Sequence, residues 1–180
     1  MRTKSRRMLI MIPVLLAGLG LACTNQRSTA ANDNSYKDSV QKALEQADLK
    51  DVTVSEDRDR NTITLGGTVH SEQAKNNAAD VAKAAAGDRI IANEVSVQPV
   101  GAESEAKDIA SNVDDAIEKN YKAALISKGL DKERIRFDSK NGVLTLKGTV
   151  KSAPERQEAQ QLAQAVPNVQ QVLNQIDVRR

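Results

Sequence analysis

Aromatic residues, cysteine and histidine are scarce in this chain of 180 residues. Two Tyr, one Phe and no Trp leave little material for an aromatic cage or for the stacking of bases. The single Cys excludes an internal disulfide and any CxxC metal or redox site. The single His excludes a His-rich zinc site. We therefore expect a protein that is not an enzyme, with no catalytic residues, no metal, no cofactor and no small-molecule substrate.

The first residues have the layout of a secretory signal. Four basic residues precede an apolar run over residues 8–22, which is shorter than the about 20 residues that a membrane-spanning helix needs. The order Leu21-Ala22-Cys23 resembles a bacterial lipobox, in which the cysteine is acylated. The resemblance implies a signal peptide over 1–22, lipidation (palmitate) of Cys23 and, because Thr24 and not Asp follows, the periplasmic face of the outer membrane. A soluble periplasmic protein is the alternative.

A polar tether is expected over residues 23–35, which hold almost no apolar side chains. Without residues 1–22 the chain has 22 basic and 24 acidic residues. No overall positive charge then favours nucleic acid, and we expect no nucleic-acid partner.

The rest of the chain is an internal repeat with an offset of 81 residues. The register holds without a gap from Ala43 on Ala124 to Val97 on Val178, and 15 of these 55 pairs are identical. We therefore predict two copies of one module, over 36–100 and 108–180, joined by a linker over 101–107.

Each copy predicts the order helix, strand, strand, helix, strand. Apolar residues at helical spacing indicate a first helix over 36–44 in copy one and from about 108 to 128 in copy two. Asn141-Gly142 is typical of a two-residue hairpin turn, and Ser152 with Glu155 predicts a capping box. Because a helix separates the last two strands, we expect them to be parallel. The fold class is α+β: two tandem αββαβ modules, each a three-stranded mixed sheet covered on one face by two helices.

The chain resembles the BON domain family of bacterial periplasmic and outer-membrane proteins. The resemblance rests on the αββαβ order, on Leu65-Gly67-Val69 and Leu146-Gly148-Val150, and on the final strands over 91–97 and 172–178. It implies a dual-BON outer-membrane lipoprotein or an osmotically inducible periplasmic protein. For such proteins, phospholipid binding and envelope integrity under stress are the implied roles.

Four repeated residues have a structural interpretation. Gly67 and Gly148 indicate a close strand–helix approach or a bulge before the cap. Asn93 and Asn174 lie on the apolar side of their strands, where such an amide is expected to bond to nearby backbone.

The two copies differ in net charge. Residues 36–100 hold eight basic and eleven acidic residues, whereas residues 107–180 hold thirteen basic and ten acidic residues. The basic residues of copy two gather on its first helix and just after it, with a few apolar residues between them. A solvated polar surface is one interpretation, and contact with anionic lipid is the other. The predicted phospholipid-binding residues are Lys119, Tyr121, Lys122, Ile126, Lys128, Lys132, Arg134 and Arg136.

These observations favour a lipid-anchored protein that binds anionic phospholipid membranes through its second module and supports envelope integrity under osmotic or envelope stress. The alternative is an adaptor that binds an envelope protein partner through exposed sheet faces or edges.

Overall fold

The computed structural model describes residues 36–179. The predicted signal peptide, Cys23 and the tether over 23–35 lie outside the described residues. Within the described range, no helix combines the length and the apolar composition that crossing a membrane requires.

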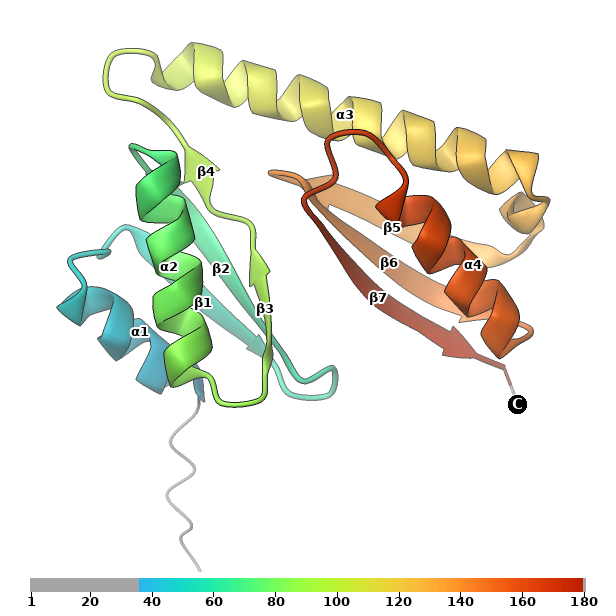
Figure 1. Ribbon diagram of the computed structural model, residues 1–180, viewed down its shortest axis with the longest axis horizontal. Helices are drawn as coiled ribbons and strands as arrows, with labels where there is room; N and C mark the ends of the chain where they lie inside the picture. Colours follow the sequence, from blue (N-terminus) through green and yellow to red (C-terminus); the bar gives the residue numbers. More distant parts are fainter. Residues whose placement is uncertain (1–35, 180) are drawn as a thin grey trace, which may run out of the picture. The chain divides into compact units, whose positions relative to one another are not determined.

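The first module has the predicted order of elements, with one interruption (Figure 1). Its elements are α1 (Tyr36–Gln46), β1 (Val52–Asp57), β2 (Thr62–Val69), α2 (Glu72–Ala85), β3 (Ile90–Asn93) and β4 (Ser96–Val97). Strand β2 is antiparallel to β1 and parallel to both β3 and β4. The parallel pairing is confirmed, but the single last strand predicted here is broken into two short strands, at Glu94 and Val95.

The second module repeats the order with an unbroken last strand. Its elements are α3 (Glu103–Ser127), the 3₁₀ turn η1 (Leu130–Lys132), β5 (Arg134–Lys140), β6 (Val143–Val150), α4 (Ala153–Gln164) and β7 (Gln171–Val178). Helix α3 begins five residues before the start predicted at 108. Glu103 and Glu105 stand in its first turn, where negative charge stabilises the helix dipole, so most of the predicted linker is helical.

Each module has its own core between the sheet and its two helices, as the α+β prediction required (Figure 1). In the first module, Val40 and Leu44 of α1 pack with Ile63 and Leu65 of β2, and all four are fully buried. In the second module the buried residues of α3 recur every four positions, which places them on one face of the helix; they are Ile117, Tyr121 and Leu125.

The predicted caps and turns are present. The Ser152 side chain accepts a hydrogen bond from the backbone N–H of Glu155, and the Glu155 carboxylate accepts one from the N–H of Ser152, which makes a capping box. Asn141 and Gly142 both have positive φ, at 49° and 83°, as a type I′ hairpin turn requires.

Gly67 and Gly148 stand where two strands approach closely. Gly148 has a φ of 113°, and a Cβ there would overlap the carbonyl oxygen of Arg134 on β5. Gly67 has a φ of 93° and meets the carbonyl oxygen of Asp51 in the same way. The close approach is therefore to the backbone at the start of β5 and just before β1. Of the two predicted alternatives, the approach to a helix was wrong.

The two repeated asparagines bond to nearby backbone, in the manner that the pattern predicted. The Asn93 side-chain amide donates to the carbonyl of Lys75 on α2 at 2.9 Å, and that of Asn174 donates to the carbonyl of Arg156 on α4 at 3.2 Å. Since these pairs are related by the repeat offset, each module ties its last strand to its second helix with the same contact.

Candidate functional site

The residues predicted to contact lipid lie on two sides of the edge strand β5. Helices α3 and α4 cover one face of the β5–β6–β7 sheet, with α3 over β5 and α4 over β6 and β7. Along β5, Ile135 and Phe137 pack into the core under α3, whereas Arg134 and Arg136 alternate with them and are exposed. Because neighbouring residues of a strand point to opposite faces, the two arginines project from the face that the helices leave open.

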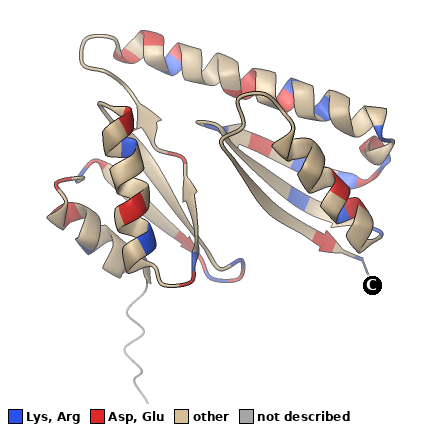
Figure 2. Cartoon of the chain, viewed as in Figure 1, with Lys and Arg blue, Asp and Glu red and all other residues tan. Residues whose placement is uncertain are grey.

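The helical part of the set forms an exposed stripe on α3. Lys119, Lys122 and Ile126 are spaced three and four residues apart, so they share one side of the helix, and all are exposed. Ile126 is 55% exposed. After Glu118, the only charged residues of α3 and its C-cap are Lys119, Lys122 and Lys128 (Figure 2). This basic stripe continues into η1, which ends at the exposed Lys132.

Tyr121 does not belong to this surface, and its predicted contact with lipid was wrong. Its side chain is fully buried, its hydroxyl donates to the carbonyl of Ala159 at 3.2 Å, and its ring meets Phe137 edge to face at 5.0 Å. Burial raises the pKa of the hydroxyl. The reason is helical register: Tyr121 lies four residues from both Ile117 and Leu125, which point into the core.

The arginines belong to a second basic cluster, on the open face of the sheet. Arg136 lies opposite Lys147 of β6, and Arg134 lies opposite Thr149. Arg134, Arg136 and Lys147 therefore stand side by side and are exposed. Lys147 was not among the predicted residues, although its alternation with Leu146 along β6 placed it on this face. The structure thus separates one predicted basic surface into two.

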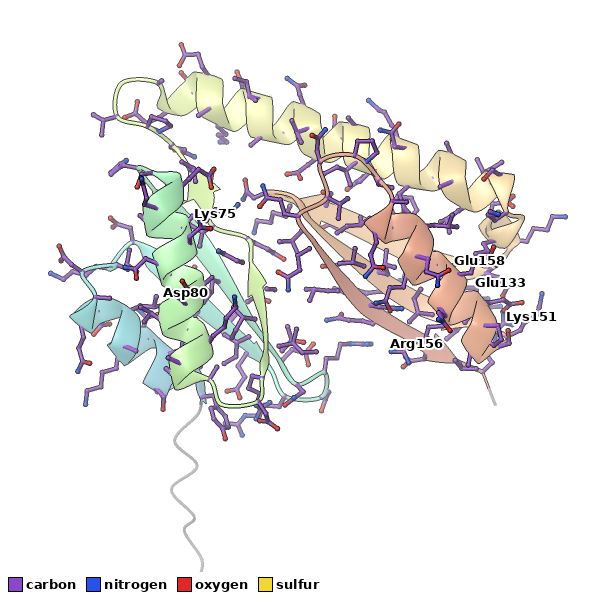
Figure 3. All side chains as sticks on the ribbon, in the orientation of Figure 1. Lys75, Asp80, Glu133, Lys151, Arg156 and Glu158 are labelled. Atoms are coloured by element: carbon purple, nitrogen blue, oxygen red, sulfur yellow. The ribbon has the colours of Figure 1, made fainter. Side chains whose placement is uncertain are left out.

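The basic residues of both clusters are available to an external anion. Within residues 36–179, neither the six predicted lysines and arginines nor Lys147 forms an ion pair. The nearby Glu133, in contrast, forms ion pairs with Lys151 at 2.6 Å and with Arg179 at 2.8 Å (Figure 3). The hydrogen bond from Lys151 holds the pKa of Glu133 below its ordinary value.

A groove of about 400 Å³ adjoins the stripe. Sequence reasoning did not find it, because its walls come from three elements that only the fold brings together: the end of α3, η1 and β5. The lining residues are Lys122, Leu125, Ile126, Leu130, Asp131, Glu133, Ile135 and Phe137.

The described residues offer little chemistry of other kinds. The His70 Nδ1 atom lies 2.9 Å from the carbonyl oxygen of Gln98, and the two residues directly follow the paired strands β2 and β4. In the part of the chain that the structure describes, no group of three or more His, Cys, Asp and Glu residues is placed to hold a metal ion.

A relative from Escherichia coli matches most of the chain. Osmotically-inducible protein Y of Escherichia coli (strain K12) is 27% identical over 157 residues, which cover 86% of this chain and 77% of that protein. Two solved chains of CdsD, a structural protein of the type III secretion system of Chlamydia trachomatis, align at 13% identity with TM-scores of 0.33. Those alignments cover 77% and 80% of this chain but only 62% and 61% of the solved chains.

The family match agrees with the internal repeat. The BON domain matches twice, over residues 32–99 and over residues 106–180. These segments contain the two αββαβ modules and together cover most of the sequence. The chain belongs to the BON domain family.

Proposed function

We propose that this protein binds anionic phospholipid membranes peripherally and without enzymatic activity, and that the basic stripe on α3 is the contact. One observation carries the proposal: Lys119 and Lys122 share one side of α3 with an isoleucine, Ile126, that is 55% exposed, and the exposed Lys128 and Lys132 follow within six residues of it. Within the described residues none of the four lysines has an ion-pair partner. Lysines beside a solvent-exposed apolar side chain suit an interface with anionic headgroups outside and hydrocarbon beneath.

The expected affinity is modest. Each basic residue near an anionic surface contributes about 1 kcal/mol, so the four lysines together give several kcal/mol. Lipidation at the predicted Cys23 would keep the module at a membrane and raise its effective concentration there. The basic stripe then determines the preference for anionic lipid, and the lipid anchor keeps the protein at the membrane.

The proposed setting is the bacterial envelope under osmotic or envelope stress. The relative from Escherichia coli is named for its osmotic inducibility, and the secretory signal predicts export. We place the protein at the periplasmic face of the outer membrane, lipid-anchored, with a soluble periplasmic protein as the alternative.

Vesicle flotation tests the proposal directly. The full chain with Cys23→Ser, which prevents acylation, is mixed with vesicles of phosphatidylcholine alone or with phosphatidylglycerol added. We expect co-flotation that depends on phosphatidylglycerol and weakens at high ionic strength, because salt screens exposed charges. The four basic residues before residue 8 also favour anionic vesicles, so the contribution of α3 is read as the difference from the same chain with Lys122→Glu and Lys128→Glu. Equal binding to both compositions, or none to either, would contradict the proposal.

A second candidate function is an adaptor for an envelope protein. The observation that favours it is the basic cluster of Arg134, Arg136 and Lys147 on the open sheet face, which suits an acidic protein surface. Charge reversal at Arg134 and Arg136 separates the two functions. It should leave flotation nearly unchanged if lipid meets α3, and should remove a crosslinked protein partner if the sheet face is an adaptor surface.

A further inference from the structure

We propose that the groove between α3, η1 and β5 receives one acyl chain of an anionic phospholipid whose phosphate lies on Lys122. This inference rests on the proposed function and adds to it a defined site for hydrocarbon. A surface that only attracts headgroups needs no groove, whereas a site for an acyl chain needs an apolar one beside a basic residue.

The walls of the groove are mainly apolar and come from rigid elements. Leu125 of α3 and Leu130 of η1 are 4% and 5% exposed, so they form a fixed floor. Ile135 and Phe137 of β5 are partly buried against the same core. The volume of about 400 Å³ lies in the range of about 300–1,000 Å³ that small-molecule sites occupy. Ile126 also lines the groove, and its side chain is mostly exposed and does not belong to the core.

The two modules differ at the residues that make this groove. With the offset of 81, Ile126 corresponds to Glu45, Phe137 to Glu56 and Lys122 to Gln41. In the first module the Gln41 amide donates to the Glu45 carboxylate at 3.4 Å, and Glu56 pairs with Arg89 at 3.4 Å. The second module thus has apolar side chains and a lysine where the first has two carboxylates and an amide.

The floor, in contrast, is common to both modules. Leu44 and Leu49 occupy the positions of Leu125 and Leu130, and all four leucines are buried. The shared leucines belong to the core. The two modules differ only at the other lining positions compared above, which are Lys122, Ile126 and Phe137 in the second module. Such a difference is unnecessary for folding, since the first module folds without it.

Charge complementarity selects an anionic amphiphile as the occupant. Lys122 lines the groove, and Lys128 and Lys132 lie on the segments that bound it. Of the two acidic residues in the lining, Glu133 is already engaged by Lys151 and Arg179, so Asp131 alone offsets the three lysines and the surroundings of the groove stay net positive. A neutral hydrocarbon would leave Lys122 without a partner, and a free phosphate would leave the apolar walls uncovered.

Spin-labelled lipids test the proposal on the full chain with Cys23→Ser. Methyl groups of Ile and Leu are observed by NMR in bicelles containing phosphatidylglycerol, with a nitroxide either at the end of the acyl chain or on the headgroup. We expect the acyl-chain label to attenuate the Ile126 and Leu130 methyl signals more strongly than the headgroup label does. Attenuation by the headgroup label alone would overturn the groove while leaving the proposed function intact. Attenuation by neither label would contradict both.

A matched pair of substitutions gives an independent readout. Ile126→Glu introduces the residue of the first module at an exposed position, and Ile109→Glu makes the same change on α3 at a residue that is 64% exposed and outside this groove. Partitioning into phosphatidylglycerol vesicles should fall about tenfold for Ile126→Glu and stay within about twofold for Ile109→Glu. Equal losses for the two variants would show that charge alone matters and that no acyl chain enters the groove.

Discussion

The carboxylate of Asp114 on α3 holds the backbone of Asn141 in the β5–β6 turn. Its Oδ2 accepts a hydrogen bond from the Asn141 N–H at 2.7 Å, and its Oδ1 accepts from the Gly142 N–H at 3.0 Å and from the Ser139 hydroxyl at 2.8 Å. Asp114 therefore fixes the hairpin from the helix that covers it.

Replacing Asp114 should therefore destabilise the second module. Asp114→Ala leaves two backbone N–H groups and a hydroxyl without their charged acceptor, and we expect a loss of about 2–3 kcal/mol in the free energy of unfolding. Urea unfolding followed by circular dichroism measures it. Asp115→Ala is the control, because Asp115 is exposed and its loss should cost less than about 0.5 kcal/mol.

The asparagine of the last strand offers a second stability test. Asn174→Ala removes the hydrogen bonds to the Arg156 carbonyl and the Gln160 side chain, and it also removes the acceptor for the Ile176 N–H. We expect a loss of about 1–3 kcal/mol in thermal or urea unfolding. Asn112→Ala, at an exposed site on α3, should have little effect. Equal stability of the two variants would show that Asn174 contributes nothing to holding the strand on α4.

The lowered pKa of Glu133 predicts that the stability of the protein depends on pH. This pKa is lowered below 4.5 in the folded protein, first by the hydrogen bond from Lys151. The unfolded state therefore binds the proton more readily, and the stability that this pair adds is present above about pH 4.5 and is lost as the pH falls through the folded pKa.

Glu133→Gln should flatten the loss of stability in acid. Thermal unfolding temperatures measured from pH 6 downwards should fall less steeply below about pH 4.5 for the variant than for the unmodified protein. Glu158→Gln on α4 is the control, because no ion pair of Glu158 is found among the described residues. Parallel pH profiles for all three proteins would refute the contribution of the Glu133 pair.

The repeat made most of the fold predictable from the sequence. Strands and helices that were ambiguous in one copy could be compared with the other, and the capping box at Ser152 and the turn at Asn141-Gly142 are local signals that the fold retains. The early start of α3 was missed because residues 103–107 carry charges and small side chains without an apolar period. The break at Glu94 and Val95 was missed because the alternating pattern of the last strand continues through it.

The candidate site was only partly predictable, because a side chain's direction depends on register. Charge counting located the basic module, but it could not show that Tyr121 points into the core or that Arg134 and Arg136 face away from α3. The burial of Tyr121 could have been predicted from its helical spacing to Ile117 and Leu125. The orientation of Arg134 and Arg136 could have been predicted from their alternation with Ile135 and Phe137. The groove depends on how α3, η1 and β5 meet in space, which no local pattern encodes.

The central claim is that the second module meets anionic lipid through the α3 stripe. Its most direct test compares binding of the full chain with Cys23→Ser to phosphatidylglycerol vesicles for two matched double variants. Lys122→Glu with Lys128→Glu should weaken binding at least about tenfold, since each charge near the surface contributes about 1 kcal/mol. Lys37→Glu with Lys42→Glu on α1 should change it little, because the first module is already net negative. If the α1 pair proves the more damaging, or if both pairs leave binding intact while the protein stays folded, then α3 is not the membrane contact.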